Sequence, residues 1–84
     1  MLNDELYPLI LRGLQEVLEI DDNIPADEDL LNYGFNSIRM VEFVLYLEEK
    51  ANIMIEDDLL LYDNFQNIEA IMTLIRNEQE AEKG

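Results

Sequence analysis

Apolar side chains recur at helical spacing in three separate stretches of the chain. An α-helix brings residues three and four apart onto one face, so this pattern predicts amphipathic helices. The stretches lie at about residues 3–20, 37–51 and 67–76. No pair of segments alternates apolar and polar residues as paired strands do. The sequence therefore predicts an all-α fold, a small bundle of helices.

The first and last stretches each carry one apolar face. That of the first consists of Leu6, Leu9, Ile10, Leu14, Val17 and Leu18, and we expect this helix to end near Ile20. Gly13 lies within it and either permits close packing or weakens the helix. Asn67 is a plausible N-cap for the last helix, because asparagine is favoured there. The apolar face of that helix consists of Ile68, Ile71, Met72 and Ile75.

A long acidic loop connects the first two helices, at about residues 19–35. Pro25 blocks a regular helix through its middle. We expect the loop to be pinned to the core by Leu30, Leu31 and Tyr33. Its six acids are Glu19, Asp21, Asp22, Asp27, Glu28 and Asp29. An EF-hand is excluded, because proline and alanine stand where that loop needs an oxygen ligand and a glycine. We therefore expect no dedicated metal site. The alternative is weak binding of divalent cations among the clustered carboxylates, through electrostatics alone.

The segment after the second helix is short. Residues 57–62 predict a brief third helix, with an irregular apolar loop as the alternative. With that helix the fold is a four-helix bundle with a long first loop. All 84 residues form one domain. Its folded core is expected at about residues 3–77, followed by an acidic tail at about 78–84 that frays.

Ser37 lies where the loop meets the second helix, three residues after Gly34. A hydroxyl at this place lies at the positive end of the helix dipole, near unpaired N–H groups that suit a phosphate. Ser37 is thus a candidate for carrying a phosphodiester. The alternative is that Ser37 or Asn36 only caps the helix, and the local residues by themselves favour capping.

The second helix has two apolar faces. One consists of Met40, Phe43, Val44, Leu47 and Ala51, and the other of Ile38, Val41 and Leu45. Glu42 and Glu48 border the second face, which we call the outer stripe (Ile38, Val41 and Leu45). An apolar patch rimmed by charge predicts a partner-binding surface. The alternative is that a neighbouring helix covers it.

The charge of the chain narrows its partners and chemistry. Twenty acids against five bases give a net charge of −15, which disfavours nucleic acid and anionic membranes. The acidity either attracts basic proteins or only keeps the domain soluble.

Histidine is absent, so Ser37 lacks the usual general base, which disfavours a serine hydrolase. The chain has no cysteine, no pattern of a secretory signal and no apolar run of about 20 residues. We expect a cytoplasmic monomer.

The segment Gly34-Phe35-Asn36-Ser37-Ile38 resembles the Gly-x-Asp-Ser-Leu attachment motif of acyl and peptidyl carrier proteins. The motif is short, but its setting also matches. Residues 41–49 resemble the second helix of that family, residues 53–58 the segment after it, and residues 63–68 the start of the last helix. The resemblance spans roughly residues 6–76.

This resemblance implies a four-helix carrier that is not itself an enzyme. Its serine, here Ser37, carries a 4′-phosphopantetheine arm whose thiol holds an acyl or aminoacyl group as a thioester. The implied partners are a phosphopantetheinyl transferase, an acyl- or aminoacyl-loading enzyme and enzymes that act on the tethered group. Positions that commonly face such partners correspond to Ile38, Val41, Glu42, Leu45 and Glu48. We add Arg39 as a residue that selects among partners.

Three residues depart from the family pattern. Asn36 replaces the usual aspartate, Arg39 stands where fatty-acid carriers often have an acid, and Glu56 replaces a common proline. These departures favour specialised biosynthesis, of polyketide or nonribosomal type, over housekeeping fatty-acid synthesis. The alternative function is a non-covalent acidic helical adaptor that binds a basic partner protein.

Overall fold

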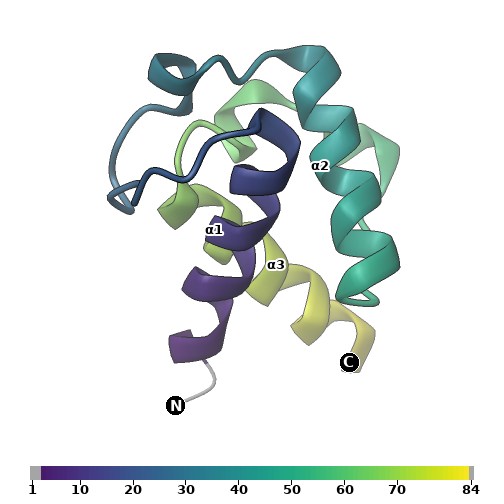
Figure 1. Ribbon diagram of the computed structural model, residues 1–84. Coiled ribbons are helices and arrows are strands. Elements are labelled where there is room, and N and C mark those ends of the chain that lie inside the picture. Colours follow the sequence, from purple (N-terminus) through teal and green to yellow (C-terminus); the bar gives the residue numbers. More distant parts are fainter. Residues whose placement is uncertain (1–2, 84) are drawn as a thin grey trace.

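The computed structural model describes the backbone of residues 3–83 and the side chains of residues 5–79. Its long elements are α1 at Asn3–Leu18, α2 at Ser37–Lys50 and α3 at Ile68–Lys83 (Figure 1). No strand occurs in residues 3–83, and the all-α class is confirmed. Three short 3-10 turns lie between the helices: η1 at Leu30–Tyr33, η2 at Asp57–Leu59 and η3 at Tyr62–Asn64.

Residues 3–83 contain three α-helices rather than the four predicted, because two 3-10 turns, η2 and η3, with a sharp bend between them replace the brief third helix expected at residues 57–62. Leu60 has φ −80° and ψ 63°, the geometry of an inverse γ-turn. The amide of Leu61 donates to the carbonyl of Leu59 at 2.8 Å, and the side-chain amide of Asn64 donates to the same oxygen at 2.9 Å. A continuous α-helix needs that carbonyl for Asp63. In the bend, that carbonyl accepts hydrogen bonds from Leu61 and Asn64 instead. In addition, so short a helix nucleates poorly.

A residue with a left-handed backbone follows the end of each of the first two helices. Glu19 has φ 59°, so α1 ends at Leu18 rather than near Ile20. The amide of Ile20 donates back to the carbonyl of Gln15 at 3.0 Å, as in a Schellman motif. Asn52, with φ 58°, follows the end of α2 in the same conformation. Both ends fall within one or two residues of the positions that the sequence predicts.

Helix α3 begins where the sequence predicts it. The side-chain oxygen of Asn67 accepts the amide of Ala70 at 2.8 Å, which confirms Asn67 as the N-cap. The helix continues to Lys83, well past Arg76. Helical geometry does not measure local stability, so a core at about residues 3–77 with a frayed acidic tail stays a prediction.

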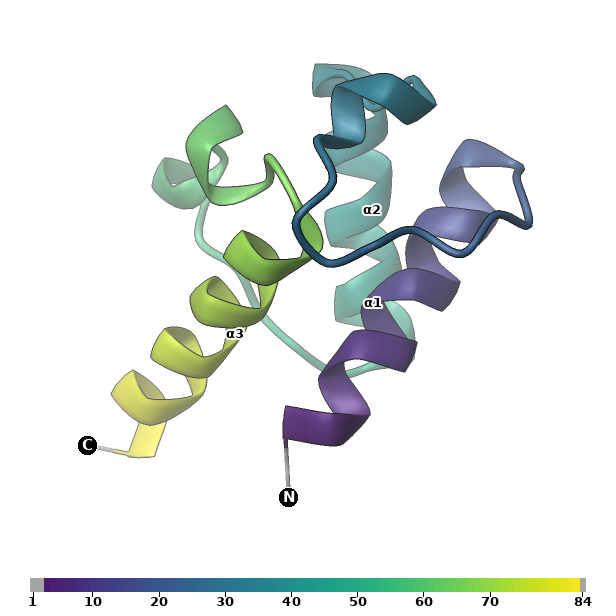
Figure 2. The ribbon, with the colours of Figure 1, turned by 90° about the vertical axis from the view of Figure 1, so that its left-hand side faces the viewer.

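Helix α1 packs against both α2 and α3, and the three enclose one core. Figures 1 and 2 show that the start of α2 lies at the end of the molecule opposite the two chain termini. Buried residues come from the helices and from the segments between them. The largest fully buried side chains are those of Ile10, Leu14, Ile24, Leu30, Phe35, Phe43, Leu47, Phe65, Ile68, Ile71 and Ile75.

Gly13 marks the closest approach of α1 to α2. A β-carbon at this position would lie 2.9 Å from ring atoms of both Phe43 and Tyr46. Contacts this short essentially do not occur, so the two rings occupy the space that a side chain would need. Of the two alternatives for Gly13, close packing is therefore the one that the structure supports.

The long first loop is fixed to the helices along its length. The Tyr7 hydroxyl donates to the carbonyl of Ile24 at 2.6 Å, and Ile24 is fully buried. Leu30 is also fully buried, and its amide donates to the carbonyl of Gln66 at 2.9 Å. The prediction that Leu31 pins the loop is wrong, because its side chain points into solvent. Buried backbone groups need partners, and these bonds provide them.

We predict that Gly13→Ala destabilises the fold. The added methyl group must displace Phe43 or Tyr46, at a cost of about 1–3 kcal/mol, against a gain in helix propensity of up to about 1 kcal/mol. The measurement is urea unfolding followed by circular dichroism. Glu16→Ala, at an exposed position of the same helix, is the control and should change stability by about 0.5 kcal/mol or less. Equal stability of both variants would contradict the prediction.

Candidate functional site

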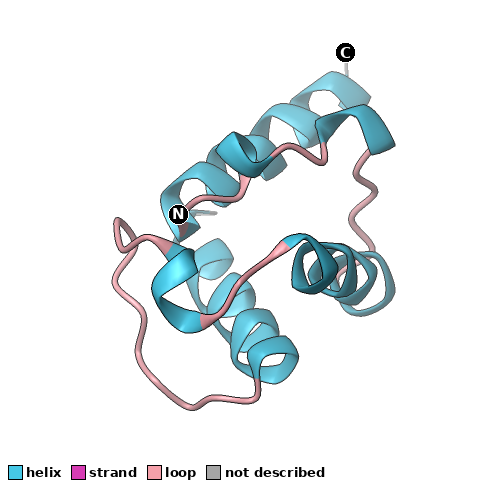
Figure 3. Ribbon diagram, turned by 90° about the horizontal axis from the view of Figure 1, so that it is seen from above, coloured by secondary structure: helices cyan, strands magenta, loops and turns pink. Residues whose placement is uncertain are grey.

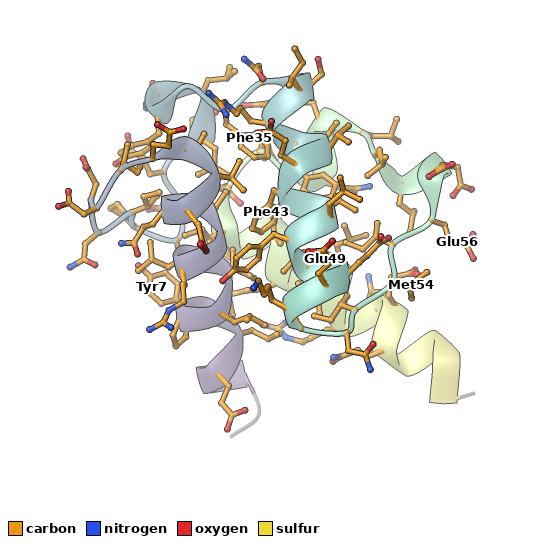
Figure 4. All side chains as sticks on the ribbon, turned by 45° about the vertical axis from the view of Figure 1, so that its right-hand side comes forward. Tyr7, Phe35, Phe43, Glu49, Met54 and Glu56 are labelled. Carbon is orange, nitrogen blue, oxygen red and sulfur yellow. The ribbon has the colours of Figure 1, made fainter. Side chains whose placement is uncertain are left out.

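The turn that leads to Ser37 is held in place from inside the protein. Gly34 adopts φ 86°, a conformation that side chains with a β-carbon rarely take. The amide of Phe35 donates to the carbonyl of Leu30 at 3.2 Å. The Phe35 ring is buried and meets the ring of Phe43 edge to face, with centroids 6.4 Å apart (Figure 4). These contacts fix the backbone immediately before the serine.

Asn36, and not Ser37, is the N-cap of α2. The side-chain oxygen of Asn36 accepts the amide of Arg39 at 2.9 Å, and its backbone carbonyl accepts the amide of Met40 at 2.8 Å. Ser37 is the first helical residue and is exposed. Among the described residues its hydroxyl has no hydrogen-bond partner. Because Asn36 does the capping, the alternative that Ser37 serves as the cap is wrong.

The site can interact with a negatively charged group. Helix geometry leaves the amides of the first turn without intrahelical acceptors. The cap satisfies that of Arg39, so the amides of Ser37 and Ile38 remain at the positive end of the dipole. An exposed hydroxyl beside such amides fits the esterified phosphate of a phosphopantetheine arm. The sequence supplies no histidine to activate the hydroxyl, so the site fits an acceptor of a group rather than a catalyst.

The outer stripe lies on the solvent side of α2. Ile38, Val41 and Leu45 are 68%, 46% and 52% exposed, whereas the opposite face of the helix is buried. The predicted exposure of the stripe is therefore confirmed, and no described helix covers it. Its role in binding partners stays a prediction.

Arg39 and Glu42 are engaged with each other. The Nη1 group of Arg39 donates to the Glu42 carboxylate at 3.0 Å and to the carbonyl of Val17 at 3.3 Å. Val17 lies in the last turn of α1, where a cation is favoured by the helix dipole. From the sequence, both side chains are expected to face partner proteins. In the structure, Arg39 links α2 to α1 and forms an ion pair with Glu42, the first acid of α2.

The remaining acids of α2 lie farther from Ser37. Glu48 is half-buried, whereas Glu49 is exposed in the same turn. Figure 4 shows Glu49 on α2, with Met54 and Glu56 on the segment that follows the helix. Because Arg39 occupies Glu42, the negative charge beside the outer stripe is concentrated toward the C-terminal half of α2.

A hydrogen bond that the sequence analysis missed joins the first loop to η3. The Tyr62 hydroxyl donates to Oδ1 of Asp29 at 2.5 Å, and the same oxygen accepts the amide of Leu31 at 3.0 Å as the N-cap of η1. The bond from Tyr62, followed by that from Leu31, lowers the pKa of Asp29. The same bond, desolvation and the charges of Asp29 and Asp63 raise the pKa of Tyr62 to about 12.

Among the described residues, no group of three or more His, Cys, Asp or Glu side chains is placed to hold a metal ion. The expectation of no metal site stays a prediction. The same part of the chain contains no helix that is both long and apolar enough to cross a membrane.

Comparisons with known proteins agree with the geometry. The sequence profile of a family described as "Phosphopantetheine attachment site" matches residues 8–75. Among solved structures, the chain is similar to one chain of the Bradyrhizobium japonicum glycine:[carrier protein] ligase complexed with glycylated carrier protein. The TM-score is 0.66 at 19% identity, over 89% of this chain and 100% of that one, which shows a shared fold. No curated protein matches the sequence significantly.

We predict that Asn36→Ala lowers the free energy of unfolding by about 1 kcal/mol, because the amide of Arg39 loses its acceptor. Asn36→Asp keeps an acceptor and adds a negative charge at the positive end of α2, so it should be at least as stable as the original chain. Urea unfolding of the three proteins checks the order. An Asn36→Ala protein that matched the original would show that the cap contributes nothing.

We also predict that alkaline pH removes stability through Tyr62. The pKa of a free tyrosine is 10.0, and folding raises that of Tyr62 to about 12. The stabilisation is therefore fully present below pH 10 and is lost as the pH rises toward 12. The stability difference between the original chain and Tyr62→Phe should be constant from pH 7 to 9 and shrink above pH 10. A difference that stays constant through pH 11 would contradict this.

Proposed function

Because the chain belongs to the family of phosphopantetheine attachment-site domains, we propose that Ser37 is its point of attachment. Domains of this family carry 4′-phosphopantetheine and are not enzymes, so the chain is a carrier protein. The observation that carries the assignment is the division of roles at the start of α2. Asn36 caps the helix, which leaves the hydroxyl of Ser37 exposed and without a partner among the described residues.

The chemistry of attachment places few demands on this chain. The Oγ atom of Ser37 forms a bond to the phosphorus of the pantetheine-bearing phosphate of coenzyme A. The bond from that phosphorus to the adenosine bisphosphate breaks, and the hydroxyl proton passes to a base on the transferase. The first-turn amides of α2 then lie beside a permanent negative charge, which the helix dipole favours. The bound arm supplies the thiol that holds the cargo as a thioester.

We further propose that the cargo is an acyl or aminoacyl group of specialised biosynthesis, of polyketide or nonribosomal type. Arg39 and Asn36 support this, since both depart from the pattern of fatty-acid carriers. The likeness to a chain from a complex between a ligase and a glycylated carrier protein also supports an aminoacyl cargo. The partners would be a phosphopantetheinyl transferase, a loading enzyme and enzymes that act on the tethered group. The cysteine-free composition supports a cytoplasmic location.

The outer stripe is the surface that we propose for these partners. Partner contact would remove Ile38, Val41 and Leu45 from water, at about 25 cal/mol per Å² before the costs of association. Exposed acids such as Glu49 would raise the rate of encounter with a basic partner. Glu48 would contribute from its half-buried position. Glu42 and Arg39 would take part only after exchanging their mutual contact for contacts with the partner.

We predict that Ser37→Ala abolishes attachment without unfolding the domain. Incubation with a promiscuous transferase and coenzyme A should add one phosphopantetheine to the original chain, as measured by intact mass. Ser37→Ala should gain no mass and should keep its helical circular dichroism, because the cap is Asn36. Attachment that persists in Ser37→Ala would overturn the site. A folded original chain that is never modified would favour the alternative of a non-covalent acidic adaptor.

We predict that Leu45→Ala weakens partner binding more than it weakens the fold. Leu45 is half exposed, so its loss should cost about 0.5 kcal/mol or less of stability, against about tenfold in affinity for the transferase. Met54→Ala is the matched control, since Met54 is also an exposed apolar side chain but lies on the segment after α2. A strongly destabilised Leu45→Ala protein with unchanged affinity would show that partners dock elsewhere.

A further inference from the structure

The bond between Tyr62 and Asp29 lies at the same end of the molecule as Ser37. Figures 1 and 2 place η1, the start of α2 and the turns η2 and η3 together at that end, and Figure 3 looks down on it. The two bonded residues are 33 positions apart in the chain. The bond therefore joins a segment that precedes Ser37 in the sequence to one that follows it.

The shared oxygen gives the bond a specific consequence for the serine. Oδ1 of Asp29 caps η1 and also accepts the Tyr62 hydroxyl. Turn η1 ends at Gly34, which leads directly to Asn36 and Ser37. Loss of the tyrosine hydroxyl would remove the hydrogen bond between η3 and η1 but leave the cap of η1 intact. The two effects can therefore be separated by substitution.

The bond holds two exposed apolar side chains in a fixed relation. Leu31, in η1, is 57% exposed, and Leu61, directly before Tyr62, is 60% exposed. Asn64 is half-buried and Phe65, directly after η3, is fully buried, so burial holds the C-terminal end of η3. Leu61, Tyr62 and Asp63 are exposed, so the start of η3 has less buried surface and depends more on the bond from Tyr62 to Asp29 for a defined position.

We propose that Tyr62 and Asp29 are a positioning pair for the modification of Ser37. Resting on the proposed function, the pair holds η3 against η1 so that the phosphopantetheinyl transferase meets Leu31 and Leu61 in one preformed arrangement at the end of the molecule where α2 begins. When the bond is absent, only a fraction of molecules present that arrangement. The apparent affinity for the transferase falls by the same fraction, whereas the chemical step in the bound complex is unchanged.

The test is steady-state kinetics of phosphopantetheine transfer to the full chain, with coenzyme A and a promiscuous transferase. Tyr62→Phe should raise the KM for the carrier by about threefold to tenfold, the range expected for one hydrogen bond, and leave kcat unchanged. Tyr33→Phe is the control. It removes a hydroxyl from η1 that has no hydrogen-bond partner among the described residues, and its KM should stay unchanged.

Asp29→Asn gives a second measurement. The asparagine oxygen still caps η1 but accepts the tyrosine hydroxyl more weakly, so its KM should lie between those of the original chain and Tyr62→Phe. In the double variant, the two effects should not add, because both act on one bond. The same kinetics therefore give an answer even if one variant fails to fold.

The outcomes are distinct. A raised KM at constant kcat in Tyr62→Phe, with additivity lost in the double variant, supports the positioning pair. An unchanged KM overturns it, as does a fall in kcat alone, and a lower melting temperature by itself shows only a structural role. Failure of the proposed function has another signature, since modification would then persist in Ser37→Ala.

Discussion

Burial of apolar side chains from the segments between the helices is the constraint on which the structure depends. A chain of 84 residues buries a limited share of its surface, and here the three helices each bury one apolar face in the core. Ile24, Leu30 and Phe35 close it from the first loop. Their burial brings the loop backbone against α1 and the start of α3. Its hydrogen-bond partners there are the Tyr7 hydroxyl, the Gln66 carbonyl and the Glu69 amide.

The burial of these loop residues also determines where Ser37 lies. Once Leu30 and Phe35 are buried, the backbone between them has to turn, and Gly34 makes the turn with its left-handed conformation. The chain then leaves the core at Asn36 and enters α2. Ser37 is thus the first residue after a fixed segment and is exposed because the residues before it are buried. Its position relative to the outer stripe follows from the helical period, which places Ile38, Val41 and Leu45 on the solvent side.

The features that the sequence predicted correctly depend on local periodicity. The three apolar faces, the Asn67 cap and the exposure of the outer stripe all follow from spacing within one element. The features that it missed depend on contacts between distant segments. The bond from Tyr62 to Asp29 has no local signature, although Asp29 before two leucines is a recognisable cap. The side chain of Leu31 was misplaced because apolar character alone does not tell which of two adjacent leucines in a turn is buried. The contact of Arg39 with Val17 needs the end of α1 beside α2, which no sequence pattern specifies.

The contacts of Arg39 change the distribution of charge around the start of α2. A net charge of −15 suggests a uniformly acidic partner surface, but Glu42, the first acid of α2, is paired with Arg39. The first turn of α2 then presents apolar side chains, unpaired amides and one hydroxyl, without a carboxylate free to repel an approaching phosphate. Like charges in the serine's immediate surroundings would oppose the arrival of the anionic donor. The other acids of α2, Glu48 and Glu49, lie in its last turn and act on the serine only at longer range, where salt screens them. In the proposed carrier role, attraction of a basic enzyme would therefore depend on acids away from the first turn of α2, and approach of the anionic donor on the first turn itself.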